Sequence, residues 1–245
     1  EAARRDNAAK IAELFADEAG RFVCATAGPT LETIMAAHGS GAVLQGREQG
    51  LTLLNIDVGG GTTKISLIEE GRIRATSAVN IGARLVAHNG SNEIIRLEKA
   101  GRRFLGDLGE SLDIGTNLSE EIGARLAGKM AQVLFDAVTT GRQPWNEFYV
   151  TSRWGQIPAV DGILFSGGVS EYIYSREARS FGDLGPYLGR AIRAESEKRG
   201  FNILEAGEGI RATVIGASQY TVQLSGETIF IPPSMTLPVR NLRVF

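Results

Sequence analysis

A carboxylate, three consecutive glycines, two threonines and a lysine stand close together in NIDVGGGTTK, residues 55–64, at the end of an apolar run. Glycines can adopt positive φ angles and let a ligand approach the main chain, and consecutive N–H groups can turn toward one anion. Threonine hydroxyls and a lysine ammonium add further donors. The stretch therefore favours a phosphate-binding hairpin. Its expected phosphate contacts are Gly59, Gly60, Gly61, Thr62, Thr63 and Lys64.

Asp57 is the last polar residue before these glycines. A carboxylate repels phosphate, but it can hold a hydrated Mg²⁺ that neutralises one, so the stretch suits a Mg–nucleotide. The other interpretation is a plain hairpin turn in which Asp57 only hydrogen-bonds the turn. Two residues suffice for such a turn, and three glycines cost more chain entropy. The stretch is not a P-loop, and Lys64 replaces the last glycine of a dinucleotide motif.

A second glycine turn follows about a hundred residues later, in ILFSGGVSEYI, residues 163–173. Residues 163–165 are expected to form a buried strand. Gly167 and Gly168 would then let a flat ligand lie against the main chain, and Ser170 could cap a following helix. A lone S-G-G is weak evidence for a ligand site, but together with the earlier hairpin it is much stronger.

The elements that position these turns can be read from hydrophobic periodicity. Segments 51–58, 63–70 and 72–79 alternate with a period of two, which predicts an antiparallel three-stranded meander. A β-rich run is expected over 21–25 and a loop over 139–160. Helices are expected to about Ala19, from Pro29 to about Ala37, around Arg96–Arg103, after a capping box at Asn117 and Glu120, from about Pro186 to Lys198, and over 211–224. Helices alternating with strands after a meander indicate an α/β fold with a mixed sheet flanked by helices.

Composition narrows the function classes. A formal net charge of −2 with 43% hydrophobic residues gives no basic footprint for nucleic acid or membrane. No leader or spanning run is recognisable, so a cytoplasmic location is expected. Cys24 is expected to be a buried thiol, and His38 and His88 have no ligand-spaced neighbours. The chain begins without Met inside a helical pattern and ends on an apolar stretch, so both ends look like cuts through a larger protein.

The two glycine turns resemble those of the actin-like ATPase and sugar kinase superfamily, which has a ribonuclease H-like fold. Its second half carries a D-x-G-G-G-T phosphate hairpin and a strand ending in a paired-glycine turn against adenosine. Four segments are similar to the ethanolamine ammonia-lyase reactivating factor (EutA) family, ATP-dependent partners of a coenzyme-B12 enzyme. They are CATAGPTLETIMAAHGSGA, NIDVGGGTTKISLIEEGRI, SAVNIGARLV and GILFSGGVSEYIY. Together they extend the resemblance over nearly the whole chain.

The resemblance implies ATP or ADP with Mg²⁺ as ligands. Asp57 would hold the metal through water, and the glycine hairpin would hold the phosphates. The adenosine contacts would be Gly167, Gly168, Val169 and Ser170. Two helices, in PTLETIMAAHGSGA and TVIGASQYTVQ, would cross at the base of the cleft. The small residues expected to let them approach are Ala36, Gly39, Gly41, Gly216 and Ala217.

The resemblance also implies a domain division. Residues 1–50 would be the end of the first lobe with its crossing helix, and 51–245 the nucleotide-binding second lobe with a helical insertion at about 83–150. Two departures stand out. No first phosphate hairpin precedes Arg21, and Gly28 stands where the heat-shock chaperone branch has a water-orienting glutamate. Glu32, one turn further along, is the candidate catalytic substitute; otherwise it is a first-turn acid favoured by the helix dipole.

The expected function is nucleotide-driven exchange of damaged cobalamin on ethanolamine ammonia-lyase, in the cytoplasm or at a bacterial microcompartment. The full-length protein would be an ATPase, and this stretch alone would be inactive. A diol dehydratase reactivase and an interaction scaffold without turnover are the alternatives. A small-molecule kinase would need an acceptor-activating aspartate, for which the sequence offers no candidate.

Overall fold

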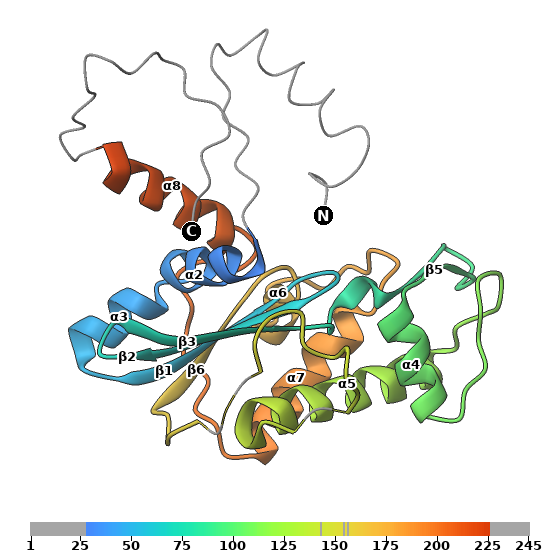
Figure 1. Cartoon of the computed structure of the whole chain (residues 1–245). Helices are drawn as coiled ribbons and strands as arrows, with labels where there is room; N and C mark the ends of the chain where they lie inside the picture. The colour runs from blue at the N-terminus through green and yellow to red at the C-terminus, as the bar shows by residue number, and fades with distance from the viewer. Residues whose placement is uncertain (1–27, 143, 154, 156, 226–245) are drawn as a thin grey trace, which may run out of the picture.

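The computed structural model describes residues 28–142, 144–153, 155 and 157–225, with side chains described through residue 218. A four-stranded sheet lies between two helical layers, with α2 and α3 on one face and α5 and α7 on the other (Figure 1). The helix and strand expected before residue 26, and Cys24, lie outside the described residues. In the described part of the chain no helix is long and apolar enough to cross a membrane.

The sheet combines a meander with one parallel strand. Strands β1 (Thr52–Val58), β2 (Thr63–Glu69) and β3 (Arg72–Val79) are antiparallel neighbours, and β6 (Gly162–Ser166) runs parallel to β1. The order is β3-β2-β1-β6. The predicted α/β class, mixed sheet and three-stranded meander are therefore confirmed.

The hydrophobic core lies on both faces of β1, because successive side chains of a strand point to opposite faces of the sheet. Leu54, Ile56 and Val58 face the larger cluster, which is completed by α5 (Glu120–Thr140) and α7 (Gly185–Lys198). Leu53 faces the smaller cluster under α2 (Pro29–Gly39) and α3 (Ala42–Gln49). Both glycine turns thus extend from strands that are fixed by packing on two sides.

The insertion between β3 and β6 differs in part from expectation. The short helix α4 (Lys99–Asp107) is present, but it follows a 3₁₀ turn η2 (Ala83–Leu85) and a ribbon of β4 (Val86–His88) and β5 (Ile94–Leu97) that the sequence did not indicate. Strands of three and four residues are too short to show a period. The expected loop after α5 contains no helix or strand among its described residues.

The cap of α5 is two residues later than predicted. The Ser119 hydroxyl accepts from the N–H of Ile122, so Ser119 is the N-cap. The Asn117 amide instead donates to the carbonyl oxygen of Ser91. Asparagine and serine are both good N-caps, and Asn117 does not cap α5 because its amide is engaged by Ser91, which is distant in sequence.

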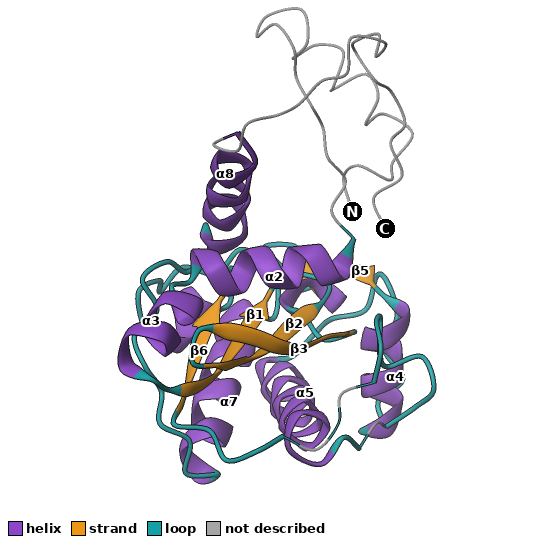
Figure 2. Ribbon diagram, turned by 60° about the vertical axis from the view of Figure 1, so that its left-hand side comes forward, coloured by secondary structure: helices purple, strands orange, loops and turns teal. Residues whose placement is uncertain are grey.

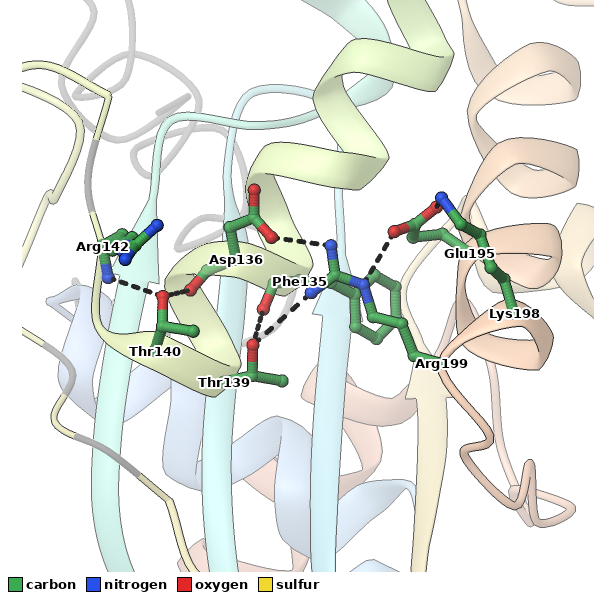
Figure 3. Close-up of polar contacts among 8 residues, drawn as sticks. All are labelled: Phe135, Asp136, Thr139, Thr140, Arg142, Glu195, Lys198 and Arg199. Atoms are coloured by element: carbon green, nitrogen blue, oxygen red, sulfur yellow. Dashed lines mark hydrogen bonds and ion pairs between the residues drawn. The ribbon is translucent and has the colours of Figure 1, made fainter.

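The end of α7 is attached to α5 through Arg199 (Figure 3). Its guanidinium lies 2.7 Å from Asp136 Oδ1 and 2.7 Å from Glu195 Oε1, and it stacks over the Phe135 ring. The Arg199 side chain is 23% exposed, so these bonds are only partly screened by water. This group therefore ties two core-forming helices together.

We expect Arg199→Ala to lower the free energy of unfolding by about 1–2 kcal/mol, because the charged hydrogen bonds and the packed stem are both lost. Lys198→Ala is the control on the same helix. The Lys198 side chain is 71% exposed and its ammonium is 3.5 Å from Glu195, so the change in the free energy of unfolding should be within about 0.5 kcal/mol. Urea unfolding of both variants measures the difference, and equal values would contradict the role given to Arg199.

Helix α8 (Ala212–Ser225) crosses α2 on the side away from the sheet (Figures 1 and 2). A Cβ at Gly39 would overlap the carbonyl oxygen of Ala212, and a Cβ at Gly216 would overlap that of Met35. The expected close approach at Gly39 and Gly216 is therefore present. Gly41 has another role, as the left-handed N-cap of α3 with φ 86°.

Candidate functional site

The two glycine turns lie side by side because β1 and β6 are parallel neighbours. Asp57 on β1 is opposite Ser166 on β6, and the Val58 carbonyl oxygen accepts from the N–H of Val169 at 3.2 Å. Gly167 has φ 81°, and a side chain there would overlap the Val58 carbonyl group. Glycine at 167 is thus required by both conformation and space.

The first turn presents free main-chain donors. The N–H of Gly59 donates to Thr62 O at 3.0 Å and closes the hairpin, whereas the N–H groups of Gly60, Gly61 and Thr62 donate to no other group among the described residues. None of the three glycines has the positive φ that the sequence suggested. The main chain of Gly82 packs closely against the turn, since a Cβ at Gly82 would overlap the Gly60 carbonyl. Three adjacent free N–H groups are suited to an anion.

Asp57 is held inside the sheet. It is 4% exposed, and its Oδ1 accepts from the Ser166 hydroxyl at 2.9 Å. Asn55 supports this contact, because its amide lies 3.4 Å from the Ser166 oxygen. Burial raises the pKa of Asp57, Lys64 and the Ser166 hydrogen bond lower it, and Glu32 raises it. The carboxylate therefore has a fixed direction and little contact with solvent.

Lys64 links two carboxylates from different parts of the chain. Its ammonium is 3.2 Å from Glu32 Oε2 and 3.9 Å from Asp57 Oδ2. Lys64 reaches Asp57 because they are register partners in β1 and β2, and Glu32 is delivered by the first turn of α2. The candidate catalytic acid and the candidate metal residue thus share one cation.

The other residues expected at the site differ in whether they line the cleft or are buried. Thr62 lines the cleft, whereas Thr63 is buried and its hydroxyl donates to the Ile81 carbonyl oxygen at 2.9 Å. Val169 and Ser170 are buried, and a Cβ at Gly168 would be in ordinary contact with Ile210 Cδ1, at 3.9 Å. Ser170 does not cap α6 (Ser170–Ile173) as predicted. Val169 is the N-cap, and the Ser170 hydroxyl donates to Gly167 O at 2.7 Å.

An open cleft of about 1690 Å³ lies beside the first turn. One wall is formed by the hairpin tip with Lys64 and Glu32, and the other by α4 and Trp145. The cations on α4 are engaged: Lys99 with Glu147 at 3.0 Å, and Arg102 with Asp113 at 2.8 Å. The paired-glycine turn is not among the residues lining this cleft.

Two side chains at the site were not singled out from the sequence. Ser166 orients Asp57, and Arg84 lies across the hairpin tip. Ser166 precedes the paired glycines and could have been found only with the β1–β6 register. Among the described residues, no three His, Cys, Asp or Glu side chains converge into a metal site.

Comparison with known proteins gives a consistent family. The model of the family described as ethanolamine utilisation protein EutA matches residues 1–245. Two proteins named ethanolamine ammonia-lyase reactivase EutA, from Salmonella typhimurium and Escherichia coli, are each 32% identical to the chain. Each alignment covers 100% of the chain and 53% of the relative, so the chain spans about half the length of these curated relatives.

A solved structure with low identity is also similar. It is the activator of the 2-hydroxyisocaproyl-CoA dehydratase from Clostridium difficile with bound ADPNP, at 16% identity and a TM-score of 0.44. The match covers 82% of this chain and 71% of that one.

Proposed function

The chain belongs to the EutA family of ethanolamine utilisation proteins, and from this premise we propose that it is the nucleotide-binding part of a reactivating factor for ethanolamine ammonia-lyase. The observation that carries the proposal is the 32% identity to two named reactivases over the entire chain. The geometry adds a hairpin with three free N–H groups beside a buried carboxylate. The proposed ligands are ATP and ADP with Mg²⁺.

The residues present fit such a ligand. The N–H groups of Gly60, Gly61 and Thr62 would donate to phosphate oxygens, with the Thr62 hydroxyl beside them. Asp57 would order the water shell of Mg²⁺, which supplies charge neutralisation to the phosphates when bound. Gly168 and the main chain of Gly167–Ser170 would lie against the adenosine. Lys64 and Thr63 are engaged inside the protein, so their expected phosphate contacts need rearrangement.

The proposed mechanism is mechanical. Nucleotide bound at the hairpin would change the charge around Asp57 and Lys64, and Lys64 also holds Glu32 on α2. Helix α2 in turn crosses α8 with its main chain in close contact at Gly39 and Gly216. ATP and ADP would favour different angles of these helices if their affinities for the two arrangements differ. The change would loosen the ammonia-lyase, so that damaged cobalamin leaves and intact cofactor enters.

We further propose the domain division expected from sequence, with residues 1–50 ending a first lobe and 51–245 forming the second, with the insertion at about 83–150. A cytoplasmic location, with association to a bacterial microcompartment where one forms, belongs to the same proposal. Glu32 would orient the attacking water once Lys64 is drawn toward the phosphates.

The test is recovery of an inactivated enzyme. Ethanolamine ammonia-lyase carrying damaged cobalamin would be incubated with the full-length protein, free adenosylcobalamin and Mg-ATP, and its activity followed. We expect recovery with Mg-ATP and none without nucleotide. A parallel incubation with diol dehydratase separates the related reactivase, since recovery of that enzyme alone would contradict the assignment.

An interaction scaffold without turnover is a second candidate. It is favoured by Gly28 in the place of the water-orienting glutamate, and by the ion pair that engages Glu32 with Lys64. Phosphate release by the full-length protein with excess Mg-ATP distinguishes the two, because a scaffold would bind nucleotide and release none.

A further inference from the structure

Arg84 lies across the tip of the glycine hairpin. Its N–H donates to the Gly60 carbonyl oxygen at 2.6 Å, and its Cγ and Cδ would each be 3.3 Å from a Cβ at Gly60. The preceding residues fix this position, because the N–H of Ala83 donates to Gly59 O at 3.0 Å and Gly82 packs on the Gly60 peptide. The stem of Arg84 therefore runs over the hairpin from a segment that the hairpin itself anchors.

The guanidinium of Arg84 is available. Arg84 is exposed, and its side chain makes no ion pair or hydrogen bond within the part of the chain that the structure describes. The nearby cations differ in this respect, since Lys64 is paired with Glu32, and Lys99 with Glu147. Five N–H donors in a planar fork are thus left for a ligand.

The charge balance at the hairpin calls for a further cation. Two carboxylates, Asp57 and Glu32, face the single ammonium of Lys64, which leaves one negative charge in excess when all three are ionised. A nucleoside diphosphate would add more negative charge to this corner than the two positive charges of the proposed Mg²⁺ offset. The free N–H groups of the hairpin donate hydrogen bonds but carry only partial charges. A full positive charge beside them would offset the repulsion.

We propose that Arg84 binds a phosphate group of the nucleotide at this hairpin and makes the site prefer nucleoside phosphates over nucleosides. The proposal rests on the nucleotide site proposed above. It gives Arg84 the charged phosphate contact that the sequence had suggested for Lys64. A guanidinium fork can contact two phosphate oxygens at once, which a lysine ammonium matches less well.

The test is calorimetric titration of the full-length protein with Mg-ADP and with adenosine. Arg84→Gln should weaken Mg-ADP binding about tenfold, as expected for loss of one charge-assisted contact, and leave adenosine binding within about twofold. Arg84→Lys should keep part of the affinity. Arg72→Gln is the matched control, because Arg72 is exposed at the opposite end of the meander and has no ion pair among the described residues.

Wild-type affinity for Mg-ADP in Arg84→Gln would overturn the assignment of Arg84 while leaving the nucleotide site standing. An equal loss for Mg-ADP and adenosine would also overturn it, because Arg84 would then only support the hairpin; thermal melting of the variant checks its fold. A wild-type protein that binds neither ligand would refute the nucleotide site and the role of Arg84 together.

Discussion

Replacement of Asp57 by asparagine is expected to weaken Mg-ADP binding about 10- to 100-fold, the range usual for a group that holds a metal through an outer shell. Asparagine is isosteric and its Oδ1 can still accept from the Ser166 hydroxyl, so the hairpin should keep its shape. What is lost is the negative charge that orders a hydrated Mg²⁺. Binding of metal-free ADP should be unchanged or tighter, because a repelling carboxylate is gone.

The same variant should be at least as stable as the wild type without ligand. Burial raises the pKa of Asp57 above its ordinary value of 3.8. A raised pKa means that the folded state binds the proton more tightly than the unfolded state, so ionisation of Asp57 destabilises the fold. That cost is absent below about pH 3.8 and grows as the pH rises through the folded-state pKa. The melting temperature of Asp57→Asn should therefore rise relative to that of the wild type as the pH is raised from acid to neutral.

Calorimetry with and without Mg²⁺, together with melting curves at several pH values, measures both effects. Glu48→Gln is the charge-matched control, since Glu48 is exposed on α3 and makes no ion pair among the described residues. Its nucleotide affinity should be that of the wild type. Equal loss of binding with and without Mg²⁺ in Asp57→Asn would show that the aspartate is structural and not a metal residue.

The main chain of the site was largely predictable because its signals are local. Alternating polarity gave the meander, and the glycine run gave the position of the turn between β1 and β2. The contacts that define its charge are not local. Lys64 meets Glu32 only because α2 docks on the sheet, and Ser166 meets Asp57 only through the parallel register. Neither packing nor register is encoded in the spacing of one short segment.

The glycines of the site show the same difference between local signals and contacts that are distant in sequence. A run of three glycines suggests positive φ, yet φ is not positive at any of them, and the left-handed residue of the site is Gly167. A small residue is needed at Gly82 because another main chain passes beside it. Local sequence can show that glycine is present, but the neighbour that requires it becomes visible only when distant segments are brought together.

Replacement of Gly216 by alanine is expected to destabilise the protein by about 3 kcal/mol, the upper part of the range for overpacking a tight contact. The added Cβ would overlap the carbonyl oxygen of Met35, which belongs to the main chain of α2 and cannot rotate away. The two helices must separate, and the matching contact of Gly39 with Ala212 would open with them.

The matched control is a second glycine-to-alanine replacement, for which the expected change in stability has the opposite sign. Gly128 lies inside α5 with no atom within 4 Å of a Cβ built there, so Gly128→Ala should stabilise by roughly 0.5–1 kcal/mol through helix propensity. Urea unfolding of both variants gives the comparison. The free N–H groups of the hairpin make no contact with Gly216, so Mg-ADP binding should persist in folded Gly216→Ala. Reactivation should be lost, because it needs the crossing helices to move as a pair. Stabilisation by both alanines would show that the close crossing of α2 and α8 is not a packing constraint. Full reactivation by Gly216→Ala would show that this crossing is not the pivot.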